Sequence, residues 1–482
     1  MGRSRRDSWR GPAGDRDQMA RTGLWWGVCA GTMALAVGPA VTLASAETLE
    51  SALAQAYRNN PQLNAQRASL RAVDENLPQA LAGYRPRVTG SIDSGYQHYE
   101  SHSLSSLGYS VTNTNISPRG GTVGLVQNIF NGERTGNSTR QAESQIFAGR
   151  ETLRNTEQSV LLDGATSYMN VMRDSAILDL QRRNVQVLQE QLKQTRDRFN
   201  VGEVTKTDVA QAESRLAAAQ SQVLSAEANL KASQAAYRRV IGVEPIGMAN
   251  GMPVDRFSPH SLEACIDLGW KTHPQVTSAQ YTVDAALYAV KVAEGALYPT
   301  ITAEANVTKR WDLAPGSNDQ LTGTVLGRMN VPIYQGGAEY SVIRQTKETL
   351  GQRRIELDLA RDQVRAAVVQ AWSQLEATKA QIIAAQAQVT ATEVALNGVR
   401  EEARVGQRTT LDVLNAQQEL VNARVSLVTA QRDRVVASFT LLAAVGRLSP
   451  QVLSLPTETY DSRVHYHQVR DQWFGVRTPD GR

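Results

Sequence analysis

Apolar and small residues recur at alternating intervals of three and four positions along two long parts of the chain. In the first part they form two consecutive stripes, Val185, Leu188, Leu192, Thr195 and Phe199, then Val209, Ala212, Leu216, Ala219, Val223, Ala226 and Leu230. The second part carries the same arrangement, Val389, Thr392, Leu396, Val399 and Ala403, then Val413, Ala416, Leu420, Ala423 and Leu427. This spacing predicts two antiparallel helical hairpins packed along heptad seams, whose alanines allow the helices to approach closely.

Both parts can hold unusually long helices. Neither residues 119–244 nor residues 333–449 contain proline, the residue that is most costly inside a helix. The first long helix is expected from about Gly132 to Asn200, which at a rise of about 1.5 Å per residue makes a rod of about 100 Å. A compact domain does not need a rod of that length, although an ordinary antiparallel coiled-coil scaffold remains an alternative.

A short turn separates the two helices of each hairpin. The turns are Asn-Val-Gly-Glu-Val-Thr at residues 200–205 and Arg-Val-Gly-Gln-Arg-Thr at residues 404–409. Gly202 and Gly406 offer the left-handed residue on which a helix commonly ends. The Thr and Asp that follow each glycine suit the first turn of the returning helix.

Between the helices, apolar and polar residues alternate, which predicts two pairs of strands. In the second half of the chain the strands are expected at 300–311 and 321–333, and in the first half near 88–97 and 123–129. Each strand has about 10 to 13 residues, the length that crosses a bilayer at a tilt. A half-buried sheet in a soluble protein alternates in the same way. The Ser-rich residues 100–117 are expected to form an external loop.

Four strands cannot close a barrel alone, and open sheet edges are not tolerated in lipid. Closure therefore implies several chains. Eight strands from a dimer would leave an interior filled by side chains, whereas twelve strands from a trimer would enclose a lumen. Aromatic residues near the strand ends are candidates for interfacial girdles, namely Tyr96, Tyr99, Phe130, Trp311 and Tyr334.

The two halves of the chain repeat each other. Leu49-Glu50 aligns with Leu262-Glu263 at an offset of 213 positions, and the later segments align at an offset of 204, so nine extra residues lie in the first copy. Solenoid repeats have periods of roughly 20 to 50 residues, so this longer unit indicates the duplication of one module. The expected divisions are a signal peptide at 1–46, a first repeat at 47–243, a linker at 244–260, a second repeat at 261–447 and a C-terminal tail at 448–482.

The first 46 residues have the features of an export signal. Residues 1–21 carry six Arg and three Asp, residues 22–46 carry no charge, and Ala44-Ser45-Ala46 supplies a small-x-small cleavage site. The mature chain is therefore expected to begin at Glu47. An uncleaved membrane anchor is the alternative, and Met19 is an alternative start.

Removal of this leader changes the arguments from charge and cysteine. The net charge of the whole chain is +4, and the leader contributes six Arg against three Asp, so the mature chain is near +1. This balance gives no support for nucleic-acid binding. Cys29 lies in the leader, where lipidation is an alternative, and leaves only Cys265, which excludes an intrachain disulfide bond.

The sequence offers no constellation for catalysis. It contains no G-x-S-x-G, H-E-x-x-H, P-loop or dinucleotide-binding motif, so no enzyme activity and no cofactor are expected. His98 and His102 fall in the expected external strand and loop, and His465 and His467 lie in the polar tail. A metal site at these histidines would need further ligands from elsewhere. A secreted or surface coiled-coil scaffold or adhesin, with no transport role, is the alternative to a membrane duct.

Taken together, these segments resemble the TolC family of outer-membrane efflux and secretion ducts over essentially the whole mature chain. The resemblance is carried by three motifs, Arg198-Phe-Asn-Val-Gly202 with Thr207-Asp208-Val209, Pro332-Ile-Tyr-Gln-Gly-Gly337, and Val405-Gly-Gln-Arg-Thr-Thr-Leu-Asp-Val-Leu414. The tail from Tyr460 to Arg477 also looks like that of members that serve type I protein secretion, although this match is less specific.

The resemblance implies a homotrimer in the outer membrane of a Gram-negative bacterium. Its 12-stranded β-barrel would contact outer-membrane lipid and continue into the periplasm as a 12-helix coiled-coil tunnel. A periplasmic adaptor (membrane fusion) protein and an inner-membrane ABC or proton-driven pump would dock at the far end, for type I protein secretion or multidrug efflux. The docking tips would be the two helix turns, at Val201 and Gly202 and at Val405 and Gly406.

The family narrows its tunnel at these turns, and the resemblance places that aperture on particular residues. Arg408 would bond to Thr207 and Asp208 on a neighbouring hairpin, and Asp412 would line the mouth. Two positions depart from the family pattern, because Asn415 stands where a second ring acid is expected and Ala403 replaces a Tyr of the latch. The residues themselves leave open that Asp208 and Asp412 are only first-turn acids favoured by the helix dipole.

Overall fold

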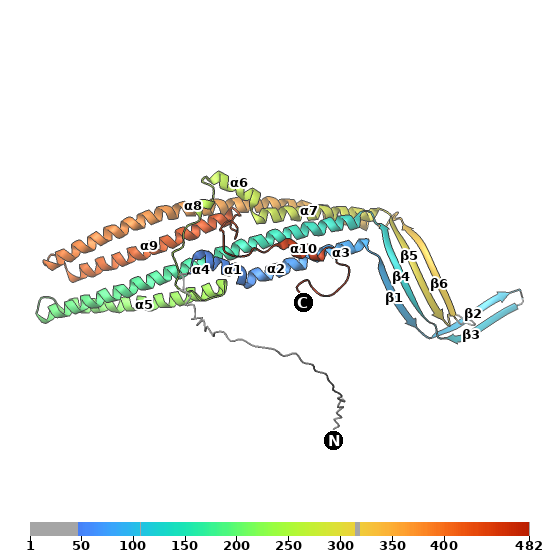
Figure 1. Cartoon of the computed structure of the whole chain (residues 1–482), viewed down its shortest axis with the longest axis horizontal. Helices are drawn as coiled ribbons and strands as arrows, with labels where there is room; N and C mark the ends of the chain where they lie inside the picture. Colours follow the sequence, from blue (N-terminus) through green and yellow to red (C-terminus); the bar gives the residue numbers. More distant parts are fainter. Residues whose placement is uncertain (1–46, 107, 314–318, 482) are drawn as a thin grey trace, which may run out of the picture. The chain divides into compact units, whose positions relative to one another are not determined.

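The computed structural model of the chain describes residues 47–106, 108–313 and 319–481. The expected signal peptide at 1–46, with Cys29, lies outside these residues. The elements follow one another in the order drawn in Figure 1. None of the described helices is both long and apolar enough to cross a membrane.

Each repeat begins with short helices and ends with a long helical hairpin. The first repeat contains α1 (Leu49–Asn59), α2 (Pro61–Asp74), α3 (Asn76–Leu81), η1 (Ala82–Tyr84), α4 (Arg134–Asn200) and α5 (Lys206–Ile241). The second contains α6 (Leu262–Thr272), α7 (Pro274–Glu294), η3 (Gly295–Leu297), α8 (Ala338–Arg404) and α9 (Thr410–Ala444), preceded by η2 (Asp255–Phe257) and followed by α10 (Ser462–Val469). Because α4 and α8 have 67 residues each, the predicted rod length of about 100 Å is confirmed.

The long helices lie side by side, with the two hairpins as neighbours (Figure 1). Helix α4 contacts α5, α7 and α9, and α8 contacts α7 and α9. The predicted heptad seams are confirmed in both hairpins by buried residues, Leu188, Leu192, Ala212 and Ala219 in the first and Val389, Leu396, Leu420 and Ala423 in the second. Phe199 is the exception, because it lies exposed near the turn.

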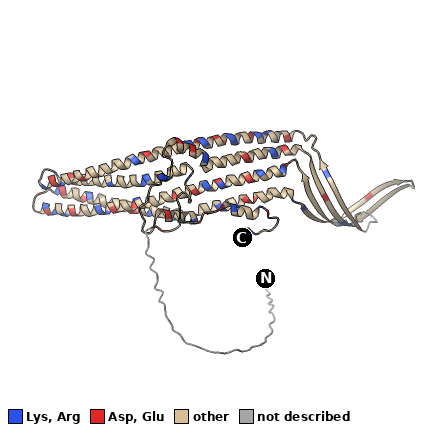
Figure 2. Ribbon diagram, turned by 45° about the horizontal axis from the view of Figure 1, so that its top comes forward, with Lys and Arg blue, Asp and Glu red and all other residues tan. Residues whose placement is uncertain are grey.

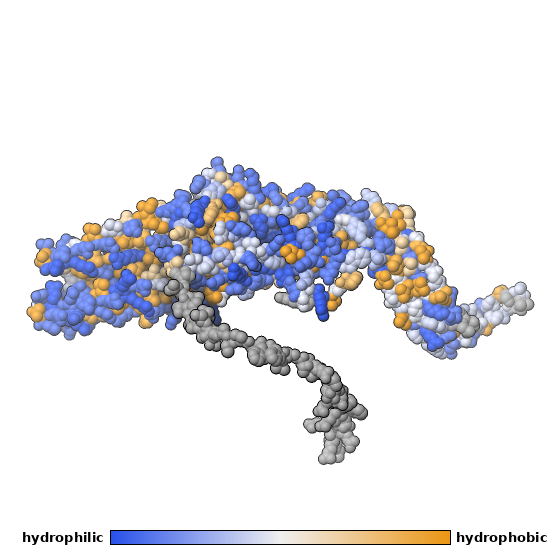
Figure 3. Space-filling view, in the orientation of Figure 1, coloured by the Kyte–Doolittle hydropathy of each residue, from blue (hydrophilic) through white to orange (hydrophobic). Residues whose placement is uncertain are grey.

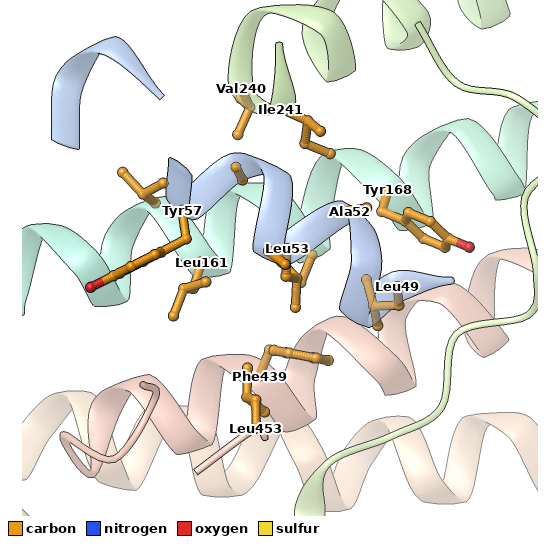
Figure 4. Packing of buried hydrophobic residues seen from close by; sticks show 14 of the residues in the cluster. Leu49, Ala52, Leu53, Tyr57, Leu161, Tyr168, Val240, Ile241, Phe439 and Leu453 are labelled. Atoms are coloured by element: carbon orange, nitrogen blue, oxygen red, sulfur yellow. The ribbon is translucent and has the colours of Figure 1, made fainter. Parts of the chain in front are cut away.

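The largest apolar core lies where α1 packs against α4, α5 and α9 (Figure 4). Leu53 of α1, Tyr168 of α4 and Phe439 of α9 are almost completely buried there. Leu453, from the segment after α9, belongs to the same cluster. Full burial of one such side chain stabilises the fold by about 1.5 to 3 kcal/mol. The start of the C-terminal tail is therefore part of the helical body.

One antiparallel sheet holds four strands, β1 (Arg87–Ser94), β4 (Arg119–Phe130), β5 (Thr300–Trp311) and β6 (Asp319–Asn330). Their order is β1-β4-β5-β6, so the two repeats join at β4 and β5, and the four strands predicted from alternation are confirmed. Several boundaries differ from the prediction, since β4 begins at Arg119 and β6 at Asp319. Strand β1 has only eight residues, and β6 ends at Asn330 because Pro332 cannot donate a ladder hydrogen bond.

The prediction of a loop at 100–117 is wrong, whereas its external position stays a prediction. These residues belong mostly to a second two-stranded sheet, β2 (Gln97–Ser105) and β3 (Gly108–Ile116). Cross-strand side-chain pairs support it: Tyr109 Oη lies 2.6 Å from His102 Nδ1, and His98 Nδ1 lies 2.8 Å from Asn115 Oδ1. Ser and Gly favour a loop, but polar cross-strand pairs such as these two stabilise a hairpin whose faces are mostly exposed.

Candidate functional site

The four-stranded sheet has one apolar and one polar face. The register places Val88, Leu125, Ala305 and Val325 in one row across all four strands. The row through Ser91, Thr122, Thr308 and Thr322 points to the opposite face. Figure 3 shows apolar side chains gathered on the strands. A sheet that presents Val and Leu on one side and hydroxyl groups on the other suits contact with lipid on one side and water on the other.

Two ion pairs lie on the polar face. Arg310 Nη1 of β5 is 3.0 Å from Asp93 Oδ2 of β1, and Arg328 Nε of β6 is 3.1 Å from Glu304 Oε1 of β5. Strand β4 lies between Asp93 and Arg310 and contributes Gly120 to that row, where an added Cβ would lie 2.9 Å from Arg310 Cγ. Sequence reasoning missed these pairs, although the glycine between opposite charges was a usable signal. A further ion pair, between Lys309 of β5 and Asp319 of β6, lies at the end of the apolar face. Most other charges lie on the helices (Figure 2).

Each outer strand of this sheet pairs on one side only. Within the described part of the chain, β1 pairs with β4 and β6 pairs with β5. The apolar row ends at these edges in Val88 and Val325, which are both exposed. Unpaired backbone groups at a sheet edge cost several kcal/mol each in hydrocarbon, so the edges need further strands in a membrane.

The helix turns at the ends of the two hairpins have the same geometry. Gly202 has φ +83° and Gly406 has φ +80°, so the predicted left-handed conformation is confirmed. The amide of Glu203 donates to Arg198 O at 2.9 Å, and the amide of Gln407 donates to Glu402 O at 2.9 Å, as expected for a Schellman ending. The two turns therefore share one backbone geometry, although the residues that follow Gly202 and Gly406 differ.

Each turn also presents an exposed apolar side chain. Val201 and Val405 are each 71% exposed, and a Cβ built on Gly202 or Gly406 would meet no atom within 4 Å. The open space around the glycines means that a larger residue there would be strained by its backbone conformation alone. The two turns therefore form matching apolar points at the ends of the rods.

Asp208 and Asp412 both act as helix-capping acids within their own hairpins. The side chain of Asp208 accepts hydrogen bonds from the amide and hydroxyl of Thr205 at 2.9 and 2.7 Å. Asp412 accepts from the amide and hydroxyl of Thr409 at 3.0 and 2.8 Å. These bonds hold the pKa of both carboxyl groups below their ordinary values. Both groups are therefore ionised near neutral pH, so a role in the cap and a negative charge at the mouth are compatible.

Arg408 pairs within its own hairpin. Its Nε donates to Glu402 Oε2 at 2.8 Å, and Glu402 raises the pKa of the guanidinium, with a smaller contribution from Asp412. Within the described part of one chain, Arg408 makes no hydrogen bond to Thr207 or Asp208. Those partners were expected on a neighbouring hairpin, so the bridge between hairpins stays a prediction.

The two positions that depart from the family pattern lie between the hairpins. Asn415 of α9 accepts a 2.8 Å hydrogen bond from Arg215 Nη2 of α5, which ties the second hairpin to the first. Ala403 lines a groove between α4 and α8 together with Val187 and Val413. Sequence reasoning missed Arg215, because a contact between residues 200 positions apart leaves no local pattern.

His465, one of the two histidines of the tail, contacts a buried carboxyl group. His465 of α10 is buried, and its Nδ1 lies 2.9 Å from Asp74 Oδ2 at the end of α2. Burial raises the pKa of Asp74, against the opposing effect of His465. Among the residues that the structure describes, no cluster of three or more His, Cys, Asp or Glu side chains could hold a metal ion.

Comparison with known proteins identifies relatives along most of the chain. The family model described as outer membrane efflux protein matches residues 52–243 and 268–447. The outer membrane efflux protein BepC of Brucella suis is 42% identical over 443 residues, which cover 91% of this chain and 94% of BepC. The outer membrane protein TolC of Escherichia coli is 25% identical over 430 residues, which cover 86% of this chain and 85% of TolC.

Two further proteins extend the comparison. The alkaline protease secretion protein AprF of Pseudomonas aeruginosa is 25% identical over 418 residues, which cover 84% of this chain and 86% of AprF. The crystal structure of the CmeC outer membrane channel of Campylobacter jejuni superposes with a TM-score of 0.74 at 15% identity, over 88% of this chain and 89% of CmeC. At that identity the likeness establishes a common fold.

Proposed function

The chain belongs to the outer membrane efflux protein family, and we propose that three copies of it form one exit duct from the periplasm to the cell exterior. The family, the mainly helical fold with a smaller set of strands, and the outer-membrane location, all predicted from the sequence, are confirmed. The role is transport, and the relatives indicate no catalytic family. The observation that carries the proposal of a trimer is the two-faced sheet, whose two outer strands each lack a second strand partner among the described residues.

The direction of the strands allows closure between copies. Because neighbours in the order β1-β4-β5-β6 are antiparallel, β1 and β6 run in opposite directions. Strand β1 of one copy can therefore pair antiparallel with β6 of the next. Three copies give twelve strands, which enclose a lumen. The rows of Val and Leu would then face lipid, and the Thr-rich rows with their ion pairs would line the passage.

The helical hairpins would continue this passage into the periplasm. Their turns lie at the end of the rods that is opposite to the sheet (Figure 1). The proposed aperture is formed there by Arg408 and Asp412, with Thr207 and Asp208 on the adjacent hairpin. The exposed Val201 and Val405 would contact a periplasmic adaptor protein, which connects the duct to an inner-membrane pump of the ABC or proton-driven type.

The names of two relatives support two kinds of cargo. BepC is named for efflux and AprF for secretion of alkaline protease. We assign this chain to export of small toxic compounds, of secreted protein, or of both. Deletion of the gene should therefore increase sensitivity to drugs and solvents or remove proteins from the culture medium, and a plasmid copy should restore either loss. A deletion strain with unchanged drug sensitivity and secretome contradicts the export role.

The trimer itself can be tested by crosslinking the two sheet edges. In a Cys265→Ser background, a cysteine at Thr89 of β1 is combined in turn with one at Thr322, Thr324 or Arg328 of β6, since the register between copies is not fixed by one chain. At least one pair should give dimer and trimer bands in outer membranes. Cysteines at Thr89 and at Thr308 of the interior strand β5 are the control and should give none. Failure of every edge pair, or release of the chain by high-salt and alkaline washing, would favour the scaffold or adhesin alternative.

A further inference from the structure

The C-terminal tail follows the helical body toward the sheet. Near its start, Arg58 of α1 donates to Pro456 O and to Thr457 Oγ1, both at 2.9 Å. Farther along, Tyr466 packs with Leu77 of α3 in a small apolar cluster. Figure 1 draws α10 along α2 and α3, with the following segment turning beside α3. The tail therefore runs along the first repeat, from α1 past α3 toward the start of β1.

The last of these contacts places the tail at the boundary between helix and strand. Arg85 lies two residues before β1, its Nη1 donates to Gln472 O at 2.7 Å, and its guanidinium carbon lies 4.8 Å from the centre of the Trp473 ring. The carbonyl of Gln472 and the indole ring thus hold the tail to the residue that leads into the membrane strand. Stacking of an arginine on tryptophan is favourable and fixes the ring orientation.

The residues that follow Gln472 expose an apolar surface. Trp473 is 62% exposed, Phe474 is 89% exposed and Val476 is 100% exposed. A large aromatic side chain that stays in water forgoes the stabilisation that its burial would give. Two exposed aromatic residues and one exposed valine lie within four residues of each other, on a segment held in place by Arg85. Contact with a partner outside this chain would bury them.

The neighbouring residues indicate what that partner is. Other exposed aromatic residues lie at the same boundary, Tyr84 just before Arg85, Tyr298 two residues before β5, and Tyr334 four residues after β6. Trp and Tyr are enriched where a membrane protein crosses from hydrocarbon to water, because their rings are apolar and their polar atoms reach the headgroups. The contact with Arg85 therefore places the apolar tail residues near the start of β1, at the same boundary as these aromatic residues.

We propose that Trp473, Phe474 and Val476 form an anchor that inserts into the periplasmic leaflet of the outer membrane beside the base of the sheet. This inference rests on the placement of the strands in the membrane and of the helices in the periplasm. Arg85 holds the anchor at that level, and Arg477 follows it at headgroup depth. The anchor would fix the tail, and with it α10, against the membrane surface.

Three labelled variants test the anchor in the full-length, assembled protein reconstituted into lipid vesicles. In a Cys265→Ser background, single cysteines replace Phe474, Val464 or Val325 and carry the same fluorophore. Val464 is the matched control on α10 of the same tail, 54% exposed. Val325 is the membrane control on the apolar face of β6. Lipids brominated in the acyl chain report contact with the bilayer, and aqueous iodide reports contact with water.

The expected result is that brominated lipid quenches most of the fluorescence at positions 474 and 325, and that iodide quenches position 464. Quenching at 325 together with iodide quenching at 474 overturns the anchor and leaves the proposed duct intact. Shielding of position 474 from both quenchers also overturns it, since that result indicates contact with protein. Loss of brominated-lipid quenching at 325 contradicts the membrane placement of the sheet instead. If Phe474→Cys does not assemble, Val476→Cys replaces it with the same criteria.

Discussion

Arg408 and Glu402 form an ion pair at the end of the second hairpin, with Nε 2.8 Å from Oε2. A guanidinium has five N–H donors, so this bond leaves both Nη groups for Thr207 and Asp208 on an adjacent hairpin. We expect Arg408→Ser to open the aperture and raise single-channel conductance, because it removes a charge-assisted contact from each copy. Arg404→Ser is the control, since Arg404 pairs with Glu401 beside the same turn. Equal conductance of Arg408→Ser and wild type would place the constriction elsewhere.

The charge of Asp412 can be separated from its capping role. Asp412→Asn keeps an oxygen that accepts from the amide and hydroxyl of Thr409 but removes the negative charge. Because Asn415 leaves one acid ring at the mouth, we expect this change to abolish most of the cation preference without widening the pore. The reversal potential in a salt gradient measures the preference, and single-channel conductance measures the width. An unchanged reversal potential would reduce Asp412 to a helix-capping residue.

The two tip glycines provide a test of adaptor docking. Gly202→Val with Gly406→Val should strain each turn by roughly 1 to 2 kcal/mol, because a β-branched residue disfavours the left-handed conformation. We predict that export is lost while the trimer still assembles, as judged by its mobility in unheated gels. Gly398→Val is the control, since Gly398 lies within α8 and an added Cβ would meet no atom within 4 Å. Full export by the double variant would argue against docking at these turns.

Asn60 and His273 occupy matching positions, because each caps the second helix of its repeat. Asn60 Oδ1 accepts from the amide of Gln62 at 2.9 Å, and His273 Nδ1 accepts from the amide of Gln275 at 3.1 Å. Burial, with a smaller effect of Arg154, lowers the pKa of His273 from 6.5 to about 4. Between these values the unfolded chain binds more protons than the folded chain. Stability therefore falls as the pH drops from about 6.5 to about 4, by up to about 3 kcal/mol per copy.

His273→Asn should remove much of this pH dependence, because it installs the uncharged cap of the first repeat. We expect the thermal midpoint of the wild-type protein to fall more between pH 7.5 and pH 5 than that of the variant. Circular dichroism of the detergent-solubilised protein gives both midpoints. A parallel loss of stability in the two proteins would show that groups other than His273 control the acid response.

Local sequence patterns predicted the parts of the fold that repeat along one element. The 3,4 spacing of residues such as Leu188 and Leu192 located the seams, and glycine located both turns. The hairpin of β2 and β3 was missed because its Ser-rich strands have no apolar face. The hydrogen bonds between Arg215 and Asn415 and between His465 and Asp74 join segments that are far apart in the sequence. A local sequence pattern therefore cannot predict them. The predicted contacts of Arg408 with Thr207 and Asp208 would join different copies of the chain, so a local pattern cannot predict them either.

Conductance of the purified, crosslink-verified trimer in planar lipid bilayers tests the central claim most directly. The two-faced sheet, whose β1 and β6 edges have no strand partner within the described residues, predicts stable channels. The predicted ring of Asp412 at the mouth makes these channels prefer cations. The same preparation of Arg408→Ser should give channels of higher conductance, which links the current to this passage. A trimer that inserts into the bilayer, resists alkaline extraction and still passes no ions would contradict the account.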